Sequence, residues 1–174
     1  KSYQKQALEL ARKTGREEQM LTVLVYLAKL SSDLKEWDAV DIYSSEALPI
    51  ATRLKKENVK AVVLLTLAQR ASYLKQYQNA ITLYRQSLEV WQASDNPTYT
   101  AFTQAAISGV YANMKVKDSA FYFANEALKL TEQYNLTHIK IDVYQALYYA
   151  SYQFGDYLKA LNYKVVADSL DKVY

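Results

Sequence analysis

Residues 67–87 read LAQRASYLKQYQNAITLYRQS, and this pattern of small and apolar residues returns 40 positions earlier and 40 and 80 positions later. Written one above another without gaps, the copies align in these columns: Leu27, Leu67, Ile107 and Leu147; Val40, Ala80, Ala120 and Ala160; Ala47, Ser87, Ala127 and Ala167. A fixed period of about 20 to 50 residues is typical of a solenoid, in which each unit buries its apolar face against its neighbours. The repeat therefore predicts an architecture more clearly than an activity.

The composition favours long helices joined by short loops. Apolar residues recur at helical spacing, and the 174 residues include only three glycines and two prolines. We expect an all-α solenoid, with about nine antiparallel helices in a right-handed superhelix and two helices in each repeat. The expected helices cover residues 1–14, 17–32, 36–54, 59–74, 77–93, 98–114, 117–133, 138–153 and 157–172.

Local signals mark several helix ends. Asn96 followed by Pro97 predicts an N-cap and a first helical residue, and Gly155 followed by Asp156 predicts the end of one helix and the cap of the next. Pro49 lies inside the expected helix 36–54, where it removes a backbone donor. There we expect a kink in a helix that continues.

The register divides the chain into a single array. Its four repeats are 17–56, 57–96, 97–136 and 137–174, and residues 1–14 precede them as the second helix of a truncated repeat. We expect this first helix to present Tyr3, Ala7 and Leu10 to the first complete repeat. The start within a repeat suggests a segment cut from a longer protein. Because terminal repeats need a polar cap, we also expect self-association through the exposed terminal repeats.

Composition argues against several classes of activity. The chain has no cysteine for a disulfide, a thiol nucleophile or a thiolate metal site, and its only histidine, His138, has no partner histidine. The net charge of +3 is small and interspersed, and the longest apolar run, 61–68, is far shorter than a membrane span. We therefore expect no enzyme activity, no cofactor, no metal, no nucleic acid and no membrane contact by this segment.

The second helix of each repeat resembles a known family. The last copy reads Gly155-Asp156-Tyr157, then Lys159-Ala160-Leu161, with Tyr163 and Ala167 further on. This closely resembles the second half of a tetratricopeptide repeat. Trp37 and Tyr77 fill the same aromatic column as Tyr157, although Lys117 departs from it and 40 residues exceed the commonest repeat length. The resemblance implies a helical array that binds proteins or peptides.

Repeats of this length are similar to those of bacterial sensors and regulators, in which the array precedes a membrane span and a histidine kinase or helix-turn-helix output. They also resemble the peptide-responsive regulators of Gram-positive bacteria. The resemblance implies the sensing part of a larger bacterial signalling or transcriptional regulator, with a periplasmic location favoured and a cytoplasmic one as the alternative. A free-standing scaffold for two protein partners is the second hypothesis, and a non-catalytic part of an enzyme is a distant third.

In this family the first helix of each repeat lines the concave face, which implies a binding site for a polypeptide. By register the candidate residues are Tyr26, Lys29, Asp33, Gln69, Tyr73, Asn113, Gln145, Tyr149 and Tyr152. Aromatic bodies with polar tips suit a polypeptide ligand, and the alternative is an ordinary solvated face with packing between repeats. Of the positions that clamp chaperone tails in related modules, only Lys29 matches.

The third repeat predicts a hollow in this face. Its first helix carries Ala105, Ala106, Gly109 and Ala112, with Tyr73 expected on one side and Tyr149 and Tyr152 on the other. Gln69, Asn113 and Gln153 would orient a ligand there. The alternative is that the small residues let the adjacent repeat pack closer and fill the space.

Overall fold

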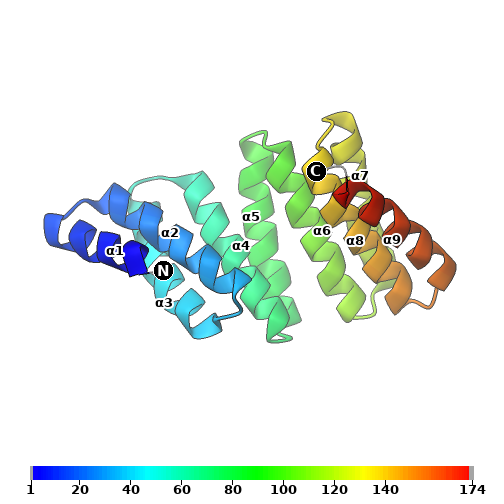
Figure 1. The fold of residues 1–174 in the computed structure, drawn as a ribbon, viewed down its shortest axis with the longest axis horizontal. Helices are drawn as coiled ribbons and strands as arrows, with labels where there is room; N and C mark the ends of the chain where they lie inside the picture. The colour runs from blue at the N-terminus through cyan, green and yellow to red at the C-terminus, as the bar shows by residue number, and fades with distance from the viewer. Residues whose placement is uncertain (1, 173–174) are drawn as a thin grey trace. The chain divides into compact units, whose positions relative to one another are not determined.

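The structure, a computed structural model, describes residues 2–172, with side chains from residue 6 onward. Helices account for nearly all of this part of the chain, and no strand occurs in it (Figure 1). The helices are α1 (Ser2–Thr14), α2 (Glu17–Asp33), α3 (Trp37–Arg53), α4 (Glu57–Tyr73), α5 (Tyr77–Ala93), α6 (Pro97–Asn113), α7 (Lys117–Gln133), α8 (Thr137–Gln153) and α9 (Tyr157–Asp171). The expected all-α class is confirmed, and the expected helix ends agree within about two residues, inside the usual scatter of such boundaries.

The turns recur every 20 residues with one geometry. In each turn, one residue just after the helix has a left-handed backbone; it is the first residue after α1 and the second after each later helix. These residues have φ from 48° to 78° and are Gly15, Lys35, Lys55, Lys75, Asp95, Lys115, Asn135 and Gly155. At the end of α2, Lys35 N donates to Ser32 O at 3.0 Å and Glu36 N donates to Ser31 O at 2.8 Å. This pair of bonds is a Schellman motif, which satisfies carbonyls that the helix end leaves open.

The predicted caps are confirmed. The Asn96 side chain accepts a hydrogen bond from Tyr99 N at 3.1 Å, with Pro97 as the first residue of α6. Asp156 Oδ1 accepts one from Lys159 N at 3.2 Å, directly after Gly155 ends α8. The helix α3 continues through Pro49, as expected.

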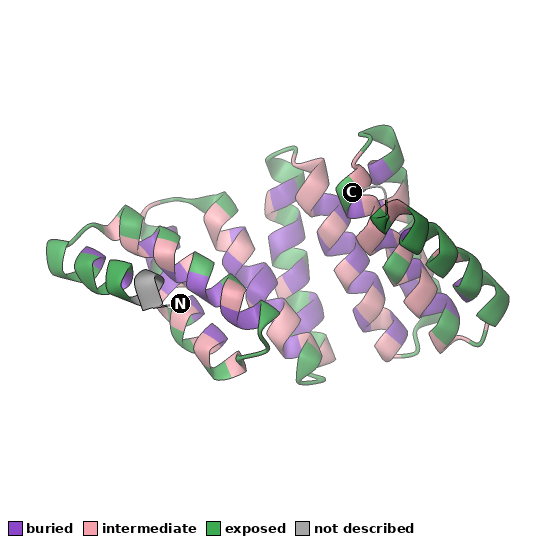
Figure 2. Cartoon of the chain, in the orientation of Figure 1, coloured by how far each residue is buried: buried purple, intermediate pink, exposed green. Residues whose placement is uncertain are grey.

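The chain forms two compact units, the first ending at Val90 and the second beginning at Trp91, within α5. The core of the first unit joins α1 to α4 and is built from Leu8, Leu21, Leu24, Leu27, Ala47, Ile50, Ala51 and Val63 (Figure 2). The main core of the second unit is built from Ala101, Ala105, Ala124, Ala127, Ile139, Val143 and Leu147. Leu27 and Ala47 in the first core, and Ala127 and Leu147 in the second, come from the aligned columns of the sequence.

The first helix docks through a different side from the one expected. Leu8 and Ala11 are buried, whereas Ala7 is exposed and Leu10 is 63% exposed; the side chain of Tyr3 lies outside the described residues. The equivalents of Ala7 in later repeats, such as Ala47, pack on the first helix of their own repeat. Because no described helix precedes α1, that position has nothing to pack against.

Candidate functional site

In the first unit, three candidate residues share one side of α2. Tyr26, Lys29 and Asp33 are spaced by three and four residues, which places them on one helical stripe, and all three are exposed. Helix α4 packs alongside α2. Ser32 Oγ donates a hydrogen bond to Gln69 Oε1 at 3.2 Å, which joins the two helices near this stripe. We use the name first-helix face for the exposed side of the first helices within each unit taken by itself, α2 and α4 in the first unit and α6 and α8 in the second.

Tyr73, at the end of α4, is held by an aromatic neighbour. Its ring centroid lies 4.7 Å from that of Trp37, the first residue of α3, with the planes tilted by 36°. Tyr73 nevertheless remains 55% exposed. Contact on one side and exposure on the other give a ring that is fixed in place yet open to a ligand.

In the second unit, Asn113 of α6 and Tyr149 of α8 are brought together. Tyr149 Oη donates to Asn113 Oδ1 at 2.6 Å. The Tyr149 ring is half-buried and packs against the cluster of Ala112, Ala120 and Ala150. Tyr149 is therefore partly a core residue, which the sequence alone did not show.

Tyr152 and Gln145 flank this pair on α8. Tyr152 is 52% exposed, and its ring centroid lies 6.2 Å from that of Tyr148 and 5.6 Å from that of Tyr157. Gln145 is exposed one turn before Tyr149. Among the candidate residues, the second unit thus offers one exposed ring, one exposed amide and one hydrogen-bonded tyrosine–asparagine pair.

The expected hollow in α6 needs correction. Ala105 and Ala112 are buried in the core, so they close the packing beneath the helix and do not line an open space. A Cβ placed on Gly109 would meet no atom within 4 Å, so no neighbour uses this glycine for a close approach. Gln153, expected to orient a ligand, instead accepts hydrogen bonds from Lys115 Nζ through both its main-chain and side-chain oxygens.

Two cavities were not foreseen from the sequence. One, of about 270 Å³, lies between α2 and α4 and is lined by Leu21, Val25 and Val59, with the Lys56–Glu18 ion pair (2.9 Å) beside it. The other, of about 280 Å³, lies in the second unit between the end of α5, the start of α6 and the second half of α7. The first borders the first-helix face; the second lies among other helix ends.

Burial raises the pKa of two ionisable groups on α8, the Asp142 carboxyl and the Tyr144 hydroxyl. Burial raises the pKa of the Asp142 carboxyl above its usual range, and the charge of His138, one turn earlier, opposes this rise. The described residues hold no group of three or more histidine, cysteine or acidic side chains that could bind a metal. None of the described helices is both long and apolar enough for a bilayer span.

Comparison with known proteins identifies the repeat. Residues 59–133 match the family model described as tetratricopeptide repeat. Residues 59–133 are therefore similar to tetratricopeptide repeats, which form protein-interaction modules, and the described residues form an all-α helical repeat structure. No curated protein sequence matches the chain.

Among solved structures, the crystal structure of BtubC (BKLC) from P. vanneervenii is similar, with a TM-score of 0.69 and 18% sequence identity. The match covers 90% of this chain and 65% of that one. At this identity the likeness shows the fold alone.

Proposed function

We propose that this chain binds a protein or peptide through its first-helix face, as the sensing or interaction part of a larger bacterial signalling or transcriptional regulator. The observation that supports it best is the exposure of three tyrosines on first helices. Tyr26, Tyr73 and Tyr152 are exposed by 52%, 55% and 52%. Tyrosine is enriched at interface hot spots because its ring supplies contact area and its hydroxyl a hydrogen bond.

The polar neighbours of these rings are partly fixed before any ligand arrives. Ser32 holds Gln69, Trp37 packs on Tyr73, and Tyr149 binds Asn113. Side chains that are already ordered lose less conformational entropy on binding. Lys29, Asp33 and Gln145 remain exposed beside them and are available to the polar groups of a peptide.

The test uses the purified chain as bait, with mass spectrometry to identify captured partners and titration to measure affinity. Tyr26→Ala, Tyr73→Ala and Tyr152→Ala should each weaken binding about tenfold, which corresponds to about 1.4 kcal/mol. Tyr122→Ala is the matched control, since Tyr122 is 61% exposed but lies on the second helix α7. Loss of binding in the control with none in the three variants would place the partner on the other helices.

The proposed role as a sensor has a separate test in the gene. A signal peptide upstream of Lys1 and a membrane span downstream of Tyr174 support a periplasmic sensing segment. A gene with neither favours a free-standing scaffold, for which the first-helix face would still bind a protein.

A further inference from the structure

The cavity between α5, α6 and α7 has an unusual lining. About 280 Å³ in volume, it is bordered by Gln92, Asp95, Gln104 and Glu126, with Trp91 and Tyr134 beside them. Its lining includes two carboxylates and no basic side chain. Since a water molecule occupies about 30 Å³ in the liquid, the space accommodates a group several times larger than water.

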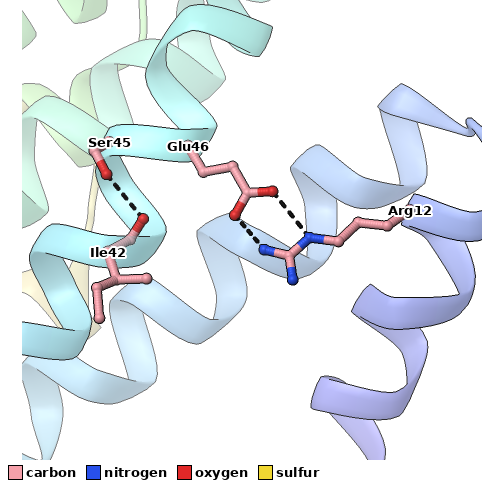
Figure 3. Close-up of polar contacts among 4 residues, drawn as sticks. All are labelled: Arg12, Ile42, Ser45 and Glu46. Atoms are coloured by element: carbon pink, nitrogen blue, oxygen red, sulfur yellow. Dashed lines mark hydrogen bonds and ion pairs between the residues drawn. The ribbon is translucent and has the colours of Figure 1, made fainter.

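The first unit shows what fills the equivalent place. The turns at Gly15 and Asp95 lie 80 residues apart and share a left-handed backbone, so Arg12 corresponds to Gln92 and Glu46 to Glu126. In the first unit the Arg12 guanidinium, from α1, binds both carboxylate oxygens of Glu46 on α3; Nε donates to Oε1 at 3.1 Å, and Nη2 donates to Oε2 (Figure 3). The second unit keeps the carboxylate, but Gln92 provides no guanidinium to bind it.

The remaining partner of Glu126 is easily displaced. Lys129, three residues later on the same helix, reaches Glu126 Oε1 at 2.6 Å, and its side chain is 72% exposed. Exposed pairs of this kind contribute little to stability. Asp95, where the first unit has Gly15, adds a second carboxylate to the wall.

The buried side of the cavity also carries a polar residue where the first unit has an apolar one. Gln104 lines it at the position where the first unit has the fully buried Leu24. Gln104 is only 8% exposed, and its Oε1 has no hydrogen-bond partner in the structure. A buried acceptor without a donor is costly, so this residue points to a donor supplied from outside the chain.

A cation fits this cavity better than an anion. The start of α6 borders the space, and a helix N-terminus carries a partial positive charge of about half a unit. The Asn96 side chain already caps it, and the carboxylates of Asp95 and Glu126 outweigh it. The guanidinium suits such a site because its planar fork binds carboxylates through two hydrogen bonds, which an ammonium cannot do.

We propose that this cavity binds an arginine side chain of a partner polypeptide, whose guanidinium takes in the second unit the place of Arg12 in the first. The site uses none of the residues to which peptide binding was assigned above, so its failure would leave the function proposed for them intact.

The two tryptophans allow a direct test, because Trp91 borders the cavity and Trp37 lies in the first unit. The probes are the N-acetyl N-methylamides of arginine, lysine and citrulline, titrated to millimolar concentration into the full ¹⁵N-labelled chain. The arginine probe should shift the Trp91 indole signal and leave that of Trp37 unmoved. The lysine probe should bind several-fold more weakly and the neutral citrulline probe not at all.

Two variants complete the experiment. Glu126→Gln should weaken the arginine probe at least tenfold, and Gln92→Arg, which supplies the guanidinium within the chain, should abolish its binding. Gln92→Arg keeps both wall carboxylates, Asp95 and Glu126, and recreates the contact seen at Arg12, so it keeps the test decisive even if Glu126→Gln folds poorly. No shift at Trp91, equal shifts from the citrulline probe, or undiminished binding of the arginine probe by Gln92→Arg would each overturn the proposal.

Discussion

Some buried hydroxyls of this fold pair with backbone carbonyls, whereas those of Ser31, Ser44, Ser108 and Ser151 have no hydrogen-bond partner in the structure. Ser87, in the column that otherwise holds alanine, donates to Ala61 O at 2.9 Å and so bonds α5 to α4. Thr103 donates to Tyr99 O one turn earlier at 2.7 Å. A small buried polar residue that is paired in this way avoids the cost of an unsatisfied group. The hydrogen bond to Ala61 O therefore accommodates serine at position 87, in a column that otherwise holds alanine.

Asp142 provides a prediction at this scale, because burial raises its pKa in the folded state and the charge of His138 only partly opposes this. Between the ordinary pKa of 3.8 and the raised value, the folded state binds more protons than the unfolded state. The contribution of Asp142 to stability is therefore full below 3.8 and is lost as the pH rises through the raised pKa. Asp142→Asn should be more stable than the parent at neutral pH, and the difference should vanish below pH 3.8.

Urea unfolding at both pH values measures this difference. Glu89→Gln, an exposed neutralisation on α5, controls for the change in net charge. A variant that loses stability at neutral pH would show that the carboxylate of Asp142 is needed in the fold.

At the scale of the helices and turns, the left-handed backbone of the turns conflicts with the conformational preference of some residues that occupy it. Four of the eight left-handed turn positions hold lysine, although glycine adopts this backbone at less cost. The Schellman bonds and the packing of the flanking helices hold these residues there. Turn position follows from the 20-residue spacing even where the residue type gives no signal.

The glycines of α6 and of the α8–α9 turn give a matched pair of predictions. Gly109 lies inside α6, and a Cβ there would meet no atom within 4 Å, so Gly109→Ala should stabilise the protein by about 0.5–1 kcal/mol. Gly155 has φ of 78°, which an alanine adopts with strain, so Gly155→Ala should destabilise it by about 1 kcal/mol. Thermal or urea unfolding of the two variants measures both effects, and a destabilised Gly109→Ala would show that α6 has a close neighbour at that point.

At the scale of the whole molecule, the sequence predicts the structural features that recur with the 40-residue repeat. The helices, their caps and the buried columns follow from apolar spacing, since each repeat packs in the same way on its neighbours. The docking side of α1 was predicted wrongly because the column that contains Ala7 is buried only when a first helix precedes it. The burial of Tyr149 and the cavity beside Glu126 were missed because they depend on which residue of one repeat meets which residue of another. Comparison of Arg12 with Gln92 was the signal in the sequence that could have indicated that cavity.

One side of α9 is apolar and is not covered by any other described residue. Leu158, Leu161 and Val165 lie on one stripe of this helix and are 72%, 59% and 59% exposed. An exposed apolar stripe of this kind favours association between copies. We therefore expect the protein to associate as its concentration rises, and the double variant Leu161→Lys with Val165→Lys to remain monomeric.

Sedimentation velocity over a range of concentrations tests this prediction. Because both positions are exposed, the double variant should keep its free energy of unfolding within about 1 kcal/mol of the parent. Gln78→Lys with Asn79→Lys, at exposed positions of α5, adds the same charge away from the stripe and should associate like the parent. If the parent stays monomeric throughout, or if both double variants suppress association equally, the stripe on α9 is not the contact surface and net charge alone governs the behaviour.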